Sequence, residues 1–156
     1  MDYETIEEIE EIEFPWLIFK LNESLYTVNS KMITSIVMEP DEITFVPKVS
    51  NYITGLIHLR GNVVPLINLK SLFNINLAED IDSKTNKRMV VVFEKDNSFV
   101  GLIVDEVLSV ENITVYEETE EIKKIAKDGF VKGIAKGHKN NEVLLILDEE
   151  KIMNVA

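Results

Sequence analysis

The stretch GLIHLRGNVVPLINLKSLF (residues 55–73) places an Arg-Gly dipeptide between two apolar, β-branched runs. These runs leave only Arg60 and Gly61 for the connection, which is the spacing of a tight β-hairpin. Pro65 lies inside the second run and cannot donate a backbone hydrogen bond. We therefore expect the second run to be an edge strand or to contain a bulge, and edges are where partners gain access.

Similar short apolar runs, broken by turn formers, continue on both sides of this hairpin. Their length and spacing are typical of a small, mostly β protein, and no βαβ unit is visible. We expect strands at 16–21, 24–29, 31–38, 42–47, 56–59, 62–69, 88–94, 98–107, 108–116, 130–137 and 142–148. We expect short helices at 70–73, within 117–128, and at 149–155, where Asp148 can cap the last helix.

The chain is expected to form a single domain over residues 14–156, made of two β lobes. Residues 74–88 are polar and lack periodicity, so we expect one lobe to give way to the next in this loop. An exchange of strands between the lobes at the ends of the chain stays open. Residues 1–13 carry seven acidic side chains and no basic one. We expect them to form a disordered tail, with folding on a partner as the alternative.

The composition excludes several classes of function. The formal net charge of −12 repels the phosphates of nucleic acids and of anionic lipids. Cysteine is absent, so a disulfide framework and a thiolate metal site cannot form. No apolar stretch is long enough to span a bilayer, and the first residues lack the pattern of a signal peptide. We therefore expect a soluble, cytoplasmic protein with no nucleic-acid partner and no membrane insertion.

The sequence offers few of the residue combinations that catalysis requires. The two histidines, His58 and His138, stand far apart without a second strong metal ligand or a nucleophile nearby. Neither a dinucleotide-binding nor a phosphate-binding glycine motif opens a helix. The sequence therefore predicts a protein that is not an enzyme and that holds neither a metal nor a cofactor.

Arg60 is the best candidate for a partner contact on residue type alone. A turn arginine is often only a solvated side chain, but this one lies among Leu56, Leu59 and Val63. A guanidinium surrounded by apolar side chains is the composition of an interface anchor. The sequence therefore favours a protein that binds other proteins.

The chain resembles the CheW-like family, which comprises chemotaxis coupling proteins and the regulatory domain of the kinase CheA. The family pattern G-x-x-x-LRG-x-x-x-P-x-x-DL is matched at Gly55, Leu59–Gly61, Pro65 and Leu69. Further similarity runs through FPWLIFKLNESLYTV, GLIVDEV and KGIAKG…VLLILDEEKIM. The resemblance covers about residues 14–154, and its motifs follow the family's order. Several motifs in the right order argue against a chance match more strongly than a single motif does.

This resemblance implies a fold of two five-stranded, SH3-like β-barrel lobes with a groove between them and a short C-terminal helix. It also implies a non-enzymatic adaptor that couples the cytoplasmic signalling tips of chemoreceptors (methyl-accepting chemotaxis proteins) to the regulatory domain of the histidine kinase CheA. Such an adaptor is cytoplasmic and is recruited to membrane receptor arrays through its partners. The resemblance implies no cofactor.

The resemblance also implies which residues bind partners. The receptor-facing positions are Ile33, Ser35, Gly55, His58 and Arg60, and the positions bordering the groove in the second lobe are Val107 and Val110. The chain departs from the family at three places: Asn68 stands where Asp is usual, Ser35 where Glu is frequent, and His58 where Asn is common. The loss of two carboxylates is expected to remove charged partners of Arg60.

Two other functions stay open at this point. A small-molecule-sensing β-barrel module would use the groove between the lobes and would need an apolar pocket with convergent polar groups. A single-stranded nucleic-acid binder would need a basic groove with stacked aromatic side chains, which the negative charge opposes.

Overall fold

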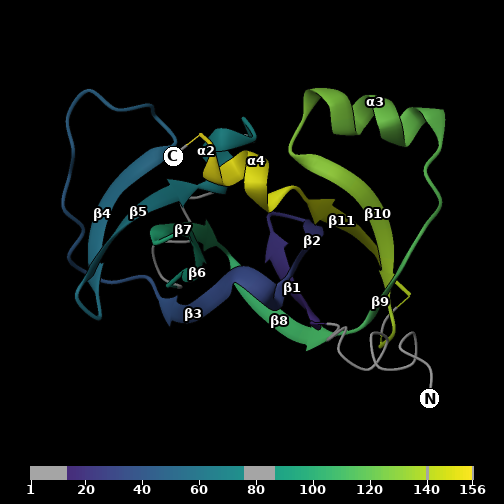
Figure 1. Cartoon of the computed structure of the whole chain (residues 1–156), viewed down its shortest axis with the longest axis horizontal. Helices are drawn as coiled ribbons and strands as arrows, with labels where there is room; N and C mark the ends of the chain where they lie inside the picture. The colour runs from purple at the N-terminus through teal and green to yellow at the C-terminus, as the bar shows by residue number, and fades with distance from the viewer. Residues whose placement is uncertain (1–13, 76–86, 140, 156) are drawn as a thin grey trace, which may run out of the picture.

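The computed structural model describes residues 14–75, 87–139 and 141–155, and its secondary structure is mostly β (Figure 1). Two sheets lie side by side. The six-stranded sheet has the order β8 (Glu106–Glu111), β1 (Trp16–Leu21), β2 (Ser24–Asn29), β11 (Val143–Leu147), β10 (Val131–Gly137), β9 (Ile113–Val115). The five-stranded sheet has the order β3 (Ile33–Met38), β6 (Met89–Lys95), β7 (Ser98–Val104), β5 (Asn62–Asn68), β4 (Ile53–Leu59). The mostly β, two-lobed fold class predicted from the sequence is confirmed, with one strand more in the first sheet. The predicted tail, 1–13, lies outside the described residues.

The six-stranded sheet curls strongly. Its two edge strands, β8 and β9, are consecutive in the chain and are separated only by Asn112. Because one residue spans only about 3.3 Å, the two edges of the sheet must come close together at this point. The single strand predicted over 108–116 is thus two strands at opposite edges.

Several strands predicted next to each other in the sequence pair as hairpins. β1 and β2 pair antiparallel around Asn22 and Glu23, and β6 and β7 pair around Asp96 and Asn97. The strand predicted at 42–47 is wrong, because this segment contributes only the single bridge between Thr44 and Leu56. Two prolines, Pro40 and Pro47, restrict the backbone at its ends.

The predicted position of the change of lobe is wrong. Residues 76–86 lie outside the described residues, but the strands before and after them, β5 and β6, belong to the same sheet. The chain passes from the six-stranded to the five-stranded sheet after β2 and returns after β7. The polar sequence thus connects two strands of the same lobe. The prediction failed because the polarity of a segment does not reveal which strands pair with each other.

Pro65 lies in an internal strand, so the predicted edge strand is wrong; the predicted alternative, a bulge, is present in the β4–β5 pair but lies on β4, between Ile53 and Gly55. β5 pairs antiparallel with β4 along its length, including the pair Leu56 and Pro65. Its parallel pairing with β7 begins only at Leu66 and Gly101. In an antiparallel pair, successive residues turn their backbone N–H and C=O groups alternately toward and away from the partner strand. Counted from the two-residue turn, the nitrogen of residue 65 faces away from β4 and toward β7. The next hydrogen bond of the parallel ladder would therefore need the N–H that proline lacks.

Three clusters of buried apolar side chains fill the part of the molecule that the structure describes. The largest lies between the two sheets and contains Phe19, Leu69, Phe93, Leu102 and Ile152 among its fully buried side chains. A second cluster lies within the curl of the five-stranded sheet and a third within that of the six-stranded sheet. Val90 to Phe93 on β6 are therefore buried on both faces of their strand, which explains the unbroken apolar run there.

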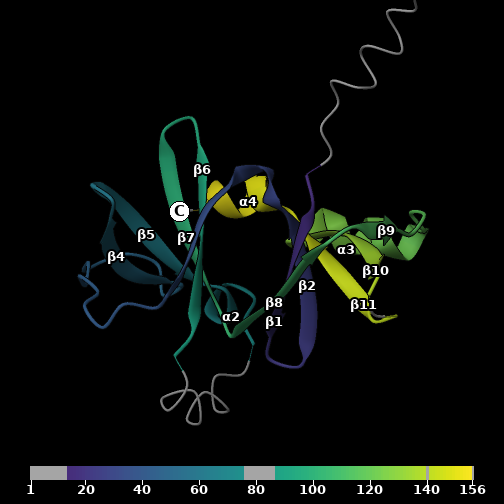
Figure 2. The same ribbon diagram turned by 90° about the horizontal axis from the view of Figure 1, so that it is seen from below.

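The helices in the described residues are short. They are a 3-10 turn, η1 (Ser30–Met32), and α2 (Leu69–Leu72), α3 (Glu120–Asp128) and α4 (Glu149–Met153). Asp148 caps α4 as predicted, its Oδ1 accepting from the Lys151 N–H at 3.1 Å. In two perpendicular views α4 lies between the two sheets (Figures 1 and 2). None of the helices in the described parts of the chain has the length and apolar character needed to cross a membrane.

Candidate partner-binding surface

Arg60 occupies the tip of the β4–β5 hairpin. Arg60 and Gly61 have φ angles of 50° and 83°, the left-handed values that a type I′ turn requires at both central positions. The side chain is exposed, and no hydrogen bond or ion pair to it is present within the described residues. The guanidinium is therefore available to an anionic group of a partner.

Beside Arg60 lies a depression of about 200 Å³ at the open end of the curled five-stranded sheet. Its floor is apolar and includes Leu59, Val64, Val92 and Phe99, which belong to or pack against the cluster inside this sheet. Its polar lining residues are Thr34, Ser35, Arg60, Asn62 and Glu94. An apolar floor with polar groups around it suits the insertion of a partner side chain.

Two of the sequence-predicted site residues, Ser35 and Arg60, meet at this depression although they lie on different strands. They come together because the five-stranded sheet curls. Its two edge strands, β3 and β4, approach each other, so that β3 and the β4–β5 hairpin border the same depression. Ile33 differs from Ser35: a register shift follows it in β3, and its side chain packs against the central cluster. Sequence reasoning missed Glu94 and Phe99, since nothing in their local pattern distinguishes them from ordinary strand residues.

Gly55 is buried. A Cβ atom at this position would lie 2.4 Å from the Thr44 backbone oxygen and 2.6 Å from the Ile43 Cγ2. The absence of a side chain thus admits the segment that forms the bridge between Thr44 and Leu56. Gly55 is buried and cannot contact a partner directly. It shapes the surface by leaving room for the segment around Thr44.

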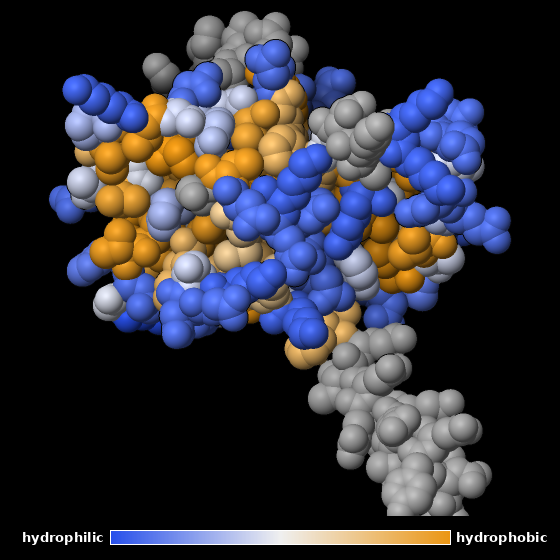
Figure 3. Space-filling view, turned by 45° about the horizontal axis from the view of Figure 1, so that its top comes forward, coloured by the Kyte–Doolittle hydropathy of each residue, from blue (hydrophilic) through white to orange (hydrophobic). Residues whose placement is uncertain are grey.

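The remaining predicted residues lie apart from the depression. His58 is exposed on β4, opposite Val63 of β5. Val107 and Val110 lie on β8 in the other sheet, where Val107 packs against the central cluster and Val110 is 48% exposed. Exposed apolar side chains also include Leu108 of β8 and Phe45, which is 77% exposed. Figure 3 shows hydrophobic surface gathered over the half of the molecule that carries β4 and β5.

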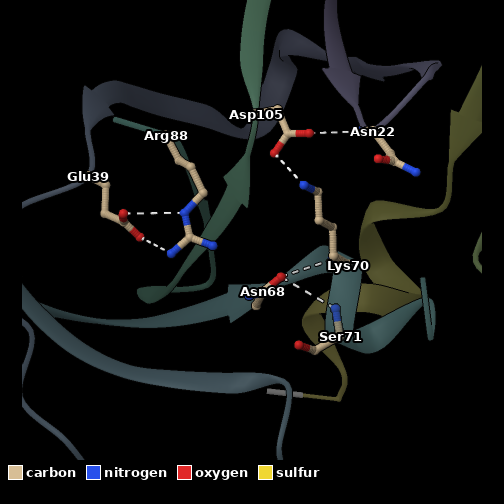
Figure 4. Close-up of polar contacts among 7 residues, drawn as sticks. All are labelled: Asn22, Glu39, Asn68, Lys70, Ser71, Arg88 and Asp105. Atoms are coloured by element: carbon tan, nitrogen blue, oxygen red, sulfur yellow. Dashed lines mark hydrogen bonds and ion pairs between the residues drawn. The ribbon is translucent and has the colours of Figure 1, made fainter. Parts of the chain in front are cut away.

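Asn68 does not accompany Arg60. It ends β5, at the far end from the hairpin tip, and the seven residues of turn and strand between Arg60 and Asn68 keep the two roughly 20 Å apart. Its Oδ1 accepts from the N–H groups of Lys70 at 3.1 Å and Ser71 at 3.4 Å, and so caps α2 (Figure 4). The expectation that a carboxylate at position 68 would pair with Arg60 is therefore wrong.

A polar connection between the sheets lies next to this cap (Figure 4). The Lys70 Nζ lies 3.0 Å from Asp105 Oδ1, and the Asn22 N–H donates to Asp105 Oδ2 at 2.7 Å. Lys70 follows β5, Asn22 follows β1, and Asp105 separates β7 from β8. The Asp105 carboxylate thus joins both sheets at the point where the chain passes from the five-stranded to the six-stranded sheet.

Glu39 and Arg88 form a second ion pair, which holds the ends of β3 and β6 together (Figure 4). The Arg88 Nη2 lies 2.6 Å from Glu39 Oε2, and its Nε donates to Glu39 Oε1 at 3.3 Å. This fork geometry fixes β3, on which Ser35 lies, against its neighbour. Within the described residues, no group of three or more acidic or histidine side chains is placed to hold a metal ion.

A model of the CheW-like domain matches residues 15–156, nearly the whole of this chain. The chain belongs to the CheW-like family. It is 32% identical over 143 residues to the chemotaxis protein CheW of Thermotoga maritima, covering 90% of this chain and 88% of that protein. It is 31% identical over 140 residues to CheW of Bacillus subtilis, covering 88% of this chain and 85% of the relative.

The fold agrees with a solved structure of the same family. The crystal structure of the scaffolding protein TtCheW from Thermoanaerobacter tengcongensis matches with a TM-score of 0.65 and 26% identity, covering 87% of this chain and 89% of that one. Membership of the CheW-like family makes this chain a non-enzymatic coupling adaptor of chemotaxis. The sequence prediction of an adaptor is confirmed, and the alternative of a small-molecule-sensing module finds no support.

Proposed function

We propose that this chain couples the signalling tip of a chemoreceptor to the regulatory domain of the histidine kinase CheA, and that the receptor binds at the depression beside Arg60. The observation that carries the proposal is the unpaired, exposed guanidinium of Arg60 next to an apolar floor. Such a guanidinium can form a bidentate pair with a carboxylate, while an apolar side chain of the same partner enters the hollow.

The other predicted residues contribute in different ways under this proposal. Ser35 and His58 touch the receptor directly, and Val110 extends the contact onto the exposed face of β8. Ile33 and Val107 hold the strands that carry this surface, because both pack on the central cluster. The partners bring the protein to the membrane array, and residues 14–156 act as one domain.

The test measures binding of a purified receptor signalling fragment and of the kinase regulatory domain, separately and together. Arg60→Glu is expected to weaken receptor binding at least tenfold, because it replaces an attraction with a repulsion at the rim of the contact. It should leave kinase binding and the melting temperature unchanged.

Lys123→Glu is the matched control, since it makes the same change of charge on α3, at an exposed side chain in the other half of the molecule. It should leave receptor binding intact. An equal loss in both variants would show a general charge effect and would refute a receptor contact at Arg60. If neither partner binds the unmodified protein, the coupling proposal itself fails.

A further inference from the structure

A pocket of about 400 Å³ opens between α2 and the start of β10, and it lies outside the candidate partner-binding surface. Its walls are apolar and aromatic, from Tyr26, Leu72, Phe73, Ile75, Phe130 and Val131. Tyr26 comes from β2 and Phe130 immediately precedes β10, whereas Phe73 follows α2 at the end of the five-stranded sheet's β5. The pocket therefore lies where the two halves of the molecule meet.

Packed rings make one wall of the pocket. The ring centres of Tyr26 and Phe73 are 5.8 Å apart, and those of Phe73 and Phe130 are 5.7 Å apart. Phe19 continues the column into the core, 5.8 Å from Tyr26. The Lys151 Nζ donates to the Gly129 backbone oxygen at 2.6 Å and lies 5.5 Å from the Phe130 ring centre. These contacts hold the wall in place before any ligand arrives.

Tyr26 supplies an unpaired polar group. The residue is only 7% exposed, and its hydroxyl makes no hydrogen bond within the described parts of the chain. In those parts, Glu149 Oε2 is the one fully enclosed side-chain oxygen or nitrogen without a hydrogen bond. The Tyr26 hydroxyl is therefore not sealed in the core, and the residue lines the pocket. An apolar ligand that fills the pocket displaces water from this hydroxyl, so a ligand that accepts its hydrogen bond binds more tightly than one that leaves it without a partner.

Burial raises the pKa of Tyr26 above its ordinary value. The phenol is therefore protonated at neutral pH and acts as a donor. A negatively charged phenolate, which would repel an acceptor, does not form in this range.

We propose that this pocket is a ligand site for a one-ring or two-ring aromatic molecule that carries a neutral hydrogen-bond acceptor. The aromatic part packs along Phe73 and Phe130, and the acceptor takes the hydrogen bond of the Tyr26 hydroxyl. The volume and the apolar lining with one polar group are those of a small-molecule pocket. The site is additional to the coupling function and does not depend on the receptor contact at Arg60.

Two probes of nearly equal size separate the hydrogen bond from apolar packing. Acetophenone carries a ketone acceptor, and ethylbenzene lacks it. Both are titrated into the full chain, and backbone amide shifts are followed by NMR. We expect the shifts to centre on Phe73, Gly129 and Phe130, and acetophenone to bind roughly fivefold to tenfold more tightly, the effect of one neutral hydrogen bond.

Tyr26→Phe keeps the ring and removes the hydroxyl. It should bring the acetophenone affinity down to that of ethylbenzene and leave ethylbenzene binding unchanged. Tyr52→Phe is the control, because the Tyr52 hydroxyl already donates to the Val155 backbone oxygen at 3.1 Å and is not part of the pocket. Equal affinities of the two probes for the unmodified protein, shifts centred elsewhere, or a ketone preference that survives in Tyr26→Phe would each overturn the proposal.

Discussion

At the scale of single residues, Asn68 shows how a family position can serve structure in place of recognition. Its side chain caps α2, with hydrogen bonds from the N–H groups of Lys70 and Ser71. The family's usual Asp could make the same hydrogen bonds, and its charge would interact favourably with the helix N-terminus.

We predict that Asn68→Asp leaves the free energy of unfolding unchanged or raises it by about 0.5 kcal/mol, whereas Asn68→Ala lowers it by about 1 kcal/mol. Urea unfolding of the three proteins at neutral pH measures the difference. Neither substitution should alter receptor affinity, and a change in affinity without a change in stability would mean that position 68 contacts the receptor.

Glu111 is a second residue whose role is structural. It is buried at the end of β8, where its Oε1 accepts from the Lys139 N–H at 3.1 Å and its Oε2 from the Ser109 hydroxyl at 2.8 Å. Burial alone raises the pKa of this carboxyl, but the hydrogen bonds outweigh burial and bring the pKa below its ordinary value. The carboxylate joins one edge of the curled sheet to the loop after β10.

A group with a lowered pKa in the folded state stabilises the protein above its unfolded pKa, about 4.3 for Glu. This stabilisation is lost as the pH falls through the lower, folded-state value. We predict that Glu111→Gln loses less stability than the unmodified protein between about pH 6 and pH 3. Urea unfolding across this range checks it, and parallel curves for the two proteins would contradict it.

At the scale of elements, the local patterns predicted the hairpins well and the sheets poorly. β1 with β2 and β6 with β7 are joined by two-residue turns, so alternation and turn residues determine them locally. The parallel pairing of β2 with β11 joins residues more than a hundred positions apart, and no local signal encodes it. Ser35 and Arg60 share a depression for the same non-local reason, so only the resemblance could group them.

Pro65 shows why an element can break a propensity rule. It is tolerated in an internal strand because the parallel ladder to β7 begins one residue later, at Leu66. The first half of β5 therefore behaves as an edge on the side of β7 while pairing with β4 on its other side. The rule that proline occurs where its nitrogen faces no partner strand therefore holds for position 65. The sequence could not reveal it, because it does not show which side of the strand is unpaired.

We predict that Pro65→Ala extends the parallel ladder, because the new N–H can donate to the Phe99 backbone oxygen. Amide hydrogen exchange of the variant should show residue 65 protected to the same extent as Ile67, within about tenfold. Val63→Ala keeps Pro65 and so has no amide at residue 65; it is the control for a general change in the strand, read as the exchange of Ile67 in both variants. Exchange of residue 65 at the rate of an exposed amide would contradict this account of the strand.

At the scale of the whole molecule, Asp105 connects the two halves. Its carboxylate holds Lys70 on one side and the Asn22 N–H on the other, and its side chain is 24% exposed. Removing its charge leaves the ammonium of Lys70, which is only 8% exposed, without this partner. The partial exposure of Asp105 reduces the cost below that of a fully buried pair.

We predict that Asp105→Asn lowers the free energy of unfolding by about 2 kcal/mol, and that Lys70→Met combined with it costs less than the sum of the two single changes. A double-mutant cycle by urea unfolding gives the coupling energy. Strictly additive changes would show that the ion pair does not contribute to holding the halves together.

The strand order also has a consequence for the order of events during synthesis. The five-stranded sheet is built from one continuous segment, β3 to β7, whereas the six-stranded sheet needs β1 and β2 together with β8 to β11. As the chain leaves the ribosome, the middle segment can acquire its pairings first. β2 must wait for β11, which follows it by more than a hundred residues, before this sheet can close. The six-stranded sheet is thus completed after the five-stranded one, and loss of β11 would leave β2 paired only with β1 and would cut β10 and β9 off from β2.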